Sequence, residues 1–463
     1  MIDASLGKER RTLLSGLLGV LCGVAFLKSW VLGFGFLFAL AGSAVLMCRP
    51  RHSWIFVLFA SFAVSNSTPQ PIGSILFWGL AAIFLAGYWL KLGSRSRVEW
   101  FPGPLWGCVL GWFSWALVSA AGSLDLTMSF KEIGRYLISF GFLLTYLNWL
   151  RTREQIQWAV RWWERISIGM AAGLCGMAFL MRLSPEGSPL NLIGPSLRSY
   201  AALGFCFAAI IPLSVSLNLA SDRPRRFQKG VGLVLLCAVL IWTRSRAACL
   251  AAIMGTLFLF WQTSRRAFRW MLVAVLVGGA AGVLFLSWNY DSIGSGLIEN
   301  LSGRPLVWKA ALSAIGESPL LGMGPGCWKA WFPKHFVGAD FLLYDRMGNW
   351  FVLPPSRLGG EAHNLFLTSA AEMGLPSVMW LVAMLFVWFC AAGRSLRSVP
   401  PGEFRALAVG SVASMFGLIF LCLFENGPII GRARGGEVVV VWLVAALPLV
   451  IGRLAPADIL EHE

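Results

Sequence analysis

Long apolar runs alternate with short polar stretches along almost the whole chain. Most runs hold roughly 16 to 20 residues, close to the ~20 that a helix needs to cross a bilayer. They lie near residues 12–27, 31–48, 54–68, 72–90, 103–121, 133–149, 165–181, 200–219, 231–243, 247–262, 270–288, 375–392, 406–424 and 438–452. The pattern predicts an all-α integral membrane protein with about 12 to 14 transmembrane helices, the lower number applying if the shortest runs do not span.

The composition supports helices that pack inside a membrane. Hydrophobic residues make up 57% of the chain and charged residues 13%, and the mean hydropathy is +0.71. Soluble globular domains do not average this way. The 23 Trp, 33 Phe and 50 Gly residues are spread through the runs, which favours packed helices over the alternating strands of a barrel.

The charge pattern indicates orientation rather than nucleic-acid binding. The formal net charge is +16, yet the basic residues gather in alternate loops between the apolar runs, as the positive-inside rule requires. They cluster at 8–11, 49–51, 91–97, 151–161, 223–229, 265–269 and 394–405. We therefore expect these loops and both termini on the cytoplasmic side, and we expect no nucleic-acid partner because no soluble basic face exists to bind one.

Cysteine usage argues against a metal centre or a disulfide framework. Nine of the ten cysteines lie within or at the ends of apolar runs, and only Cys327 lies in a long loop. The chain has no C-x-x-C motif, so these residues act as small hydrophobic side chains. We expect neither a metal nor a cofactor.

One segment on the predicted outer side is much longer than the other loops. We divide the chain into N-terminal transmembrane helices at 1–230, central helices at 231–288, this large loop at 289–363 and C-terminal helices at 364–463. Long ordered loops commonly carry function. Within the loop, Pro305 suits the first turn of a short amphipathic helix that runs to about Ile315. The glycines at 322, 324 and 326 then predict a tight turn, and their G-x-G-x-G spacing is only a weak signal for phosphate binding.

Four motifs in this order resemble the shared core of the O-antigen ligase family. They are Arg246 with Leu250 in an Arg-x-x-x-Leu pattern, Gly303-Arg304-Pro305 with Trp308, "ESPLLGMGPG" at 317–326, and His363-Asn364 ahead of an apolar run. Family members carry His-Asn, nine residues and then Gly-x-x-Gly. This chain has Gly374 at the expected place and Ser377 where the last glycine stands. The resemblance covers about residues 231–390, and the first two hundred residues match only as a series of spans.

The resemblance implies a glycosyltransferase of the bacterial cytoplasmic (inner) membrane. Such an enzyme takes a glycan from undecaprenyl pyrophosphate on the periplasmic face and joins it to a hydroxyl of a glycan or lipid acceptor. Its partners are then the lipid-linked donor, the acceptor and membrane lipids.

The reaction needs fixed positive charge beside an anionic leaving group. Arg246 lies on the predicted outer side, where the positive-inside bias disfavours it, and Arg304 precedes the predicted loop helix. A guanidinium binds phosphate oxygens in a bidentate manner. Arg244 is a further substrate-binding candidate, although it can equally snorkel to lipid headgroups, and Gly324 is a candidate contact to phosphate.

His363 is the candidate general base. An ordinary histidine has a pKa of about 6.5, and a helix start just after the ring disfavours the imidazolium form, so the neutral ring can accept a proton from the acceptor hydroxyl. A loop histidine satisfied by the backbone is the alternative. Asn364 is also a substrate-binding candidate. Asn364, Glu361 or Glu372 could orient the ring, and a role in the helix start or in packing is equally open for each.

Three functions stay open at this point. A ligase would move a finished glycan to a different acceptor, a polymerase would extend one lipid-linked glycan with another, and a transporter would move the glycan without chemistry. A transporter commonly shows internal repeats and ionisable residues at mid-membrane depth, which this sequence does not. The His-Asn-x9-Gly element favours the ligase.

Overall fold

The computed structural model of the chain describes residues 98, 100, 103–183, 200–221, 223–243, 245–288, 295–335, 342–344, 350–352, 362–426 and 436–454, and parts of 77–89. Residues 1–96 with 434–436 form one compact unit, and residues 97–433 with 437–463 form the other. All the helices and strands named below belong to the second unit, apart from the first residue of α19. The division into four parts by sequence stays a prediction.

The described chain is helical except for one small hairpin. The helices are α5 (Gly103–Ala121), α6 (Leu126–Trp149), α7 (Arg153–Leu183), α9 (Tyr200–Leu219), α10 (Arg223–Trp242), α11 (Arg246–Thr263), α12 (Arg265–Trp288), α13 (Ser295–Glu317), α14 (Trp328–His335), α16 (Leu365–Met373), α17 (Leu375–Ser398), α18 (Glu403–Leu421) and α19 (Gly436–Ile451). Strands β1 (Leu342–Tyr344) and β2 (Trp350–Val352) pair antiparallel, with Leu343 opposite Phe351. The predicted all-α class is confirmed.

Several of these helices are both long enough and apolar enough to cross a membrane. Among the described residues, α5, α11, α17 and α18 qualify by length and hydropathy, and shorter apolar stretches lie in α9, α10 and α19. The chain is therefore a multi-pass membrane protein. The predicted runs before residue 72 lie outside the described residues, so the total of 12 to 14 spans stays a prediction.

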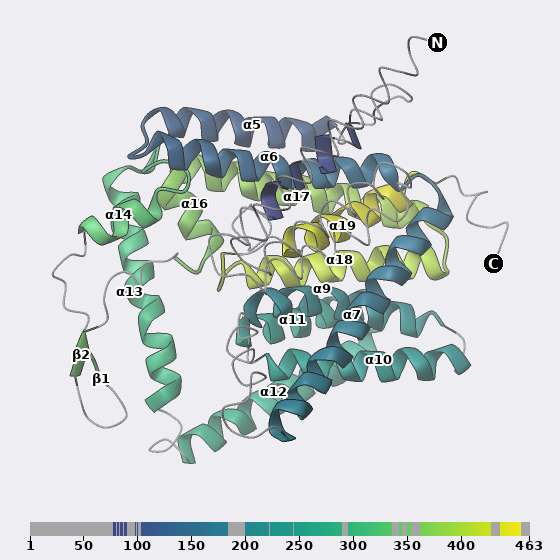
Figure 1. Cartoon of the computed structure of the whole chain (residues 1–463). Coiled ribbons are helices and arrows are strands. Elements are labelled where there is room, and N and C mark those ends of the chain that lie inside the picture. The colour runs from purple at the N-terminus through teal and green to yellow at the C-terminus, as the bar shows by residue number, and fades with distance from the viewer. Residues whose placement is uncertain are drawn as a thin grey trace, which may run out of the picture. The chain divides into compact units, whose positions relative to one another are not determined.

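Close glycine contacts set the register of α11 against α18. Gly255 of α11 lies against the carbonyl of Ala413, and Gly417 of α18 lies against the carbonyl of Ala251. A step of four residues back along α11, from Gly255 to Ala251, corresponds to a step of four residues forward along α18, from Ala413 to Gly417. The two helices are therefore antiparallel. One turn further on, the start of α11 lies level with the end of α18 (Figure 1).

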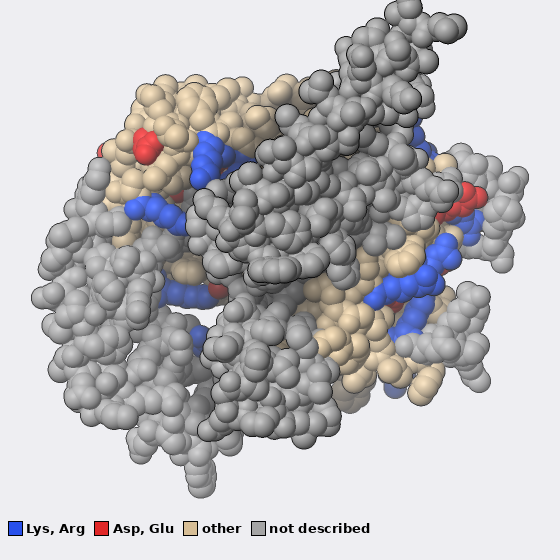
Figure 2. Space-filling view, in the orientation of Figure 1, with Lys and Arg blue, Asp and Glu red and all other residues tan. Residues whose placement is uncertain are grey.

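Charged residues lie towards the ends of the helices. In Figure 2 Lys and Arg side chains of the described residues show near both ends of the bundle, and the described surface between them is mostly uncharged. One end carries the starts of α10, α12 and α18 with basic clusters that the sequence predicts to be cytoplasmic (Figure 1). The opposite end carries α13, α14 and α16 (Figure 1).

A sharp break separates α16 from α17. Gly374 lies between them with φ 75°, a conformation that glycine adopts without a Cβ penalty. A Cβ at this position would overlap the carbonyl of Leu320, and the N–H of Leu375 donates to the carbonyl of Pro319 at 2.8 Å. The break therefore fixes the 317–326 loop against the His-Asn motif.

The loop helix α13 differs from its predicted start. It begins at Ser295 and ends at Glu317, so the predicted end is correct while Pro305 lies inside the helix. A proline within a helix removes one backbone hydrogen bond. The start prediction was wrong because it treated Pro305 as a boundary.

Candidate functional site

His363 stands at the start of α16 in a fixed but accessible position. Its φ is 49°. A left-handed backbone in a residue other than glycine costs on the order of 1–3 kcal/mol and persists only where its surroundings impose it. Asn364 caps α16 by accepting from the N–H of Leu367 at 3.0 Å, and its amide donates to the carbonyl of Leu423 at 2.9 Å. The side chain of His363 is 43% exposed. A substrate can therefore reach a ring whose backbone is held from both sides.

Glu425, just beyond the end of α18, joins two of the predicted site residues. Its Oε2 lies 3.0 Å from Nδ1 of His363, and its Oε1 accepts from Nη2 of Arg304 at 2.7 Å. The carboxylate is 21% exposed and the Arg304 side chain 27%. Arg304 and His363 therefore lie close together, joined by a carboxylate that the sequence interpretation did not name.

A small apolar core holds Arg304 relative to His363. Val307, Ala310, Ala311 and Ala314 line one face of α13, and all are buried. They pack with a cluster that includes Ala362, directly before the histidine. The remaining members are Met323, Cys327, Trp328, Trp331, Phe332 and Ala371. Burying this apolar face fixes the distance between the arginine and the imidazole.

Arg246 begins α11 at the same end of the bundle. The register of α11 against α18 sets it level with Cys422, directly after the last residue of α18. Glu425 follows within one turn, and its N–H donates to the carbonyl of Leu421 at 3.0 Å. Arg246 is exposed. Its pyrophosphate-binding role stays a prediction, and Arg244 lies outside the described residues.

The glycine turn is built around a second carboxylate, Glu372. This side chain is 1% exposed, and it accepts from the N–H of Gly326 at 2.7 Å and of Trp328 at 3.1 Å. The N–H of Gly324 donates to the backbone carbonyl of Glu372 at 2.8 Å, and a Cβ on Gly324 would overlap Ser123. Gly324 therefore serves close packing, and its contact to phosphate stays a prediction.

Three residues are sequence candidates for orienting the histidine ring. Glu372 bonds the glycine turn rather than the ring, Asn364 uses its side chain to start α16, and Glu361 lies outside the described residues. Glu425 is the carboxylate that contacts the imidazole. The signal for it in the sequence is "FENG" at 424–427, an acidic residue ending an apolar run on the predicted outer side.

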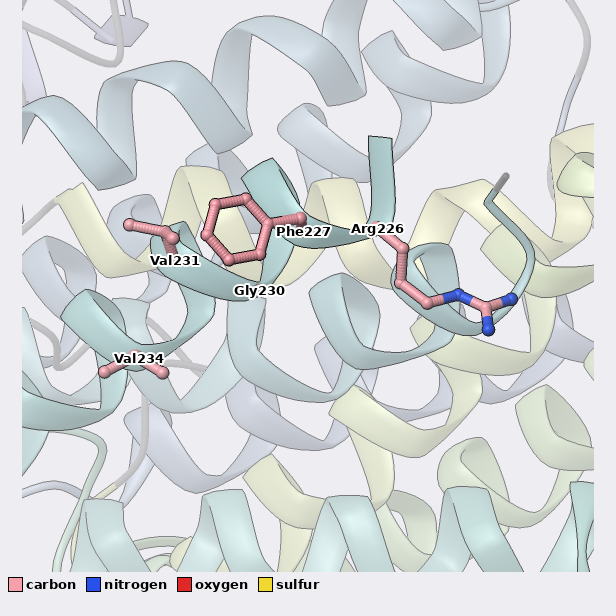
Figure 3. A pocket seen from close by; sticks show the side chains of 5 residues that line it. All are labelled: Arg226, Phe227, Gly230, Val231 and Val234. Atoms are coloured by element: carbon pink, nitrogen blue, oxygen red, sulfur yellow. The ribbon is translucent and has the colours of Figure 1, made fainter. Parts of the chain in front are cut away.

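A pocket of about 590 Å³ lies elsewhere, on α10. Arg226, Phe227, Gly230, Val231 and Val234 line it, as Figure 3 shows. These residues belong to the half of α10 next to its basic start, whereas Arg246 follows the other end of that helix. The pocket contains none of the predicted catalytic residues. Within the described residues, no group of three His, Cys, Asp or Glu side chains could hold a metal ion.

The arrangement suits proton transfer beside an anion. A carboxylate on Nδ1 favours the tautomer with the proton on that nitrogen, which leaves the Nε2 lone pair as the acceptor. It also stabilises the imidazolium that forms after proton uptake, opposing the effect of the α16 start. The site can thus accept a proton at His363 while an arginine binds an anion nearby.

Comparison with known proteins covers the region that contains Arg246, Arg304 and His363, and this region ends before Glu425. Residues 231–382 match the model of a family described as O-antigen ligase. The chain is also 23% identical over 387 residues to the exopolysaccharide production protein ExoQ of Rhizobium meliloti (strain 1021), covering 77% of this chain and 80% of that protein. The matched region includes Arg246, Arg304 and His363, and it ends inside α17. The expected resemblance is confirmed: residues 231–382 of this membrane protein match the O-antigen ligase family model.

Proposed function

We propose that the protein transfers a glycan from undecaprenyl pyrophosphate to an acceptor hydroxyl on the periplasmic face of the bacterial cytoplasmic membrane. The observation that carries this proposal is the chain of contacts from Arg304 through Glu425 to His363. It joins an anion-binding side chain to a proton acceptor in a region of the O-antigen ligase family. The family supports membrane glycan ligation or polymerisation, and the residue roles are our inference.

The proposed reaction is a single displacement at the anomeric carbon of the donor. The acceptor hydroxyl gives its proton to Nε2 of His363 while its oxygen forms a bond to that carbon. The bond from the anomeric carbon to the pyrophosphate oxygen breaks, and the electron pair leaves with undecaprenyl pyrophosphate. Arg304 and Arg246 stabilise the charge that develops on the leaving group. One displacement inverts the anomeric configuration.

The charge pattern of the loops supports a periplasmic location for the site. Basic residues cluster at the starts of α10, α12 and α18, which favours the cytoplasm for that end. His363, Glu425 and the start of α11 belong to the opposite end. An anionic lipid donor with its glycan outside would present its pyrophosphate there.

The acceptor distinguishes two versions of the function. The His-Asn-x9-Gly element and the family description favour ligation to a different acceptor. The relative named for exopolysaccharide production favours polymerisation, in which the acceptor is a second lipid-linked glycan. The chemistry proposed for His363 and the arginines is the same in both.

Deleting the protein and analysing the cell's glycans tests the function. A lost ligase leaves full-length polymer unattached, and a lost polymerase leaves single repeats. A transporter would instead trap lipid-linked glycan on the cytoplasmic face, which would contradict the proposal. In a purified system, transfer should continue in a chelator, and loss of transfer that Mg²⁺ restores would contradict the role given to the arginines.

A further inference from the structure

The carboxylate of Glu425 has two partners with different chemical tasks. One oxygen is bonded to Arg304 at 2.7 Å and the other to His363 at 3.0 Å. All three side chains are partly exposed, so a ligand can approach each of them. The two contacts use separate oxygens, and one can break while the other persists.

A pyrophosphate offers Arg304 the same kind of partner as Glu425 does. Guanidinium groups bind carboxylate and phosphate oxygens in the same geometry and with comparable strength. An anionic donor bound at Arg304 therefore competes with Oε1 of Glu425 for the Nη2 donor, and it also feels the negative charge of that carboxylate. The existing ion pair thus opposes donor binding.

We propose that Glu425 is an exchangeable partner of Arg304, displaced when the pyrophosphate of the lipid donor binds. This inference rests on the function proposed above. The displaced carboxylate keeps its contact to Nδ1 of His363 and no longer shares its charge with the guanidinium. Its full charge then stabilises the imidazolium, so Nε2 becomes a stronger base only when the donor is in place.

The exchange couples donor binding to activation of the base. Donor binding at Arg304 changes the basicity of His363, and both effects act through Glu425. The two sites are therefore energetically coupled. Glu425 is therefore a positioning residue that acts through Arg304 and His363. A fixed structural carboxylate would support donor binding, whereas an exchangeable one weakens it and speeds the transfer.

The Glu425→Gln variant separates these two roles. The amide keeps the shape of the side chain and can still accept from Arg304, but it carries no charge. We expect the purified full-length variant to bind undecaprenyl pyrophosphate about fivefold or more tightly than wild type. At saturating donor we expect its transfer rate to fall by about tenfold or more. A single variant that binds better and turns over more slowly is not expected from lost folding.

Two controls make the result specific. Glu154→Gln removes the same charge from an exposed position in the first turn of α7, and should leave both quantities near wild type. In the background of Arg304→Ala, Glu425→Gln should tighten binding much less than in wild type, because the competition for that arginine is gone and only the charge repulsion remains. Equal or weaker donor binding by Glu425→Gln in the wild-type background would overturn the exchange.

A structure of the full-length wild-type protein with undecaprenyl pyrophosphate gives an independent test should the variant not fold. We expect Arg304 on a phosphate oxygen and separated from Glu425, with the contact between Glu425 and His363 retained. An intact Arg304–Glu425 pair beside bound pyrophosphate would refute the exchange. If wild type transfers glycan and His363→Ala does not, that refutation leaves the proposed function intact. If wild type transfers none, the proposed function itself fails.

Discussion

Glu372 and Glu425 are carboxylates at opposite ends of the short helix α16, and the protein uses them differently. Glu372 is 1% exposed and accepts only backbone N–H groups in the contacts described above. Glu425 is 21% exposed and bonds two ionisable side chains. A carboxylate enclosed by backbone donors organises the chain, and one that faces titratable groups beside solvent is available for chemistry.

The largest expected difference between Glu372 and Glu425 is in what each contributes to the free energy of unfolding. In Glu372→Ala, the N–H groups of Gly326 and Trp328 lose a charged acceptor, at a cost of about 3–6 kcal/mol for the two bonds. In Glu425→Ala, partly exposed ion pairs are lost, which costs less than about 1 kcal/mol. Thermal unfolding of the purified proteins in one detergent measures both. Equal losses would remove the distinction.

Cys327 offers a chemical probe of the Glu372 region. Burial raises the pKa of this thiol, so it stays protonated and unreactive at neutral pH. Opening the turn should expose it. We expect its labelling by N-ethylmaleimide at neutral pH to be about tenfold faster in Glu372→Ala than in wild type, and unchanged in Glu425→Ala.

Mass spectrometry of the peptide that contains Cys327 measures this labelling separately from the exposed cysteines Cys175 and Cys390. Acceleration in Glu425→Ala as well would mean that the two carboxylates support one common structure.

The smallest effect is expected at Ser377, which stands where the family carries a glycine. The hydroxyl of Ser377 lies 2.9 Å from the carbonyl of Ser369 and 2.7 Å from that of Gly374, and the residue is 1% exposed. Ser377→Gly should cost about 1–2 kcal/mol from one lost hydrogen bond and a more flexible backbone. The transfer rate should not change. A large loss of transfer with normal stability would give this position a role in the site.

Helices and candidate residues could be predicted because they depend on local sequence. The runs at 103–121 and 200–219 match α5 and α9, since both ends of each run are polar or break the pattern. The start of α10 at Arg223 could not be predicted from hydropathy, because basic residues outside the apolar run continue the helix.

The contacts of Glu425 with Arg304 and His363 could be identified only from the structure. It lies 62 residues from His363 and 121 from Arg304, and no local pattern links positions so far apart. The sequence did indicate both partners through the family motifs. It offered Asn364, Glu361 and Glu372 as ring partners and did not name Glu425, because proximity in sequence was the only guide.

The most direct test of the account is the rate of glycan transfer from purified lipid pyrophosphate by protein in proteoliposomes, with His363→Gln compared with wild type. His335→Gln, in α14, is the matched control. Loss of a general base lowers rates by about 100- to 10,000-fold, so we predict a fall in that range for His363→Gln and a wild-type rate for His335→Gln. Transfer by a normally folded His363→Gln protein at the wild-type rate would contradict the account.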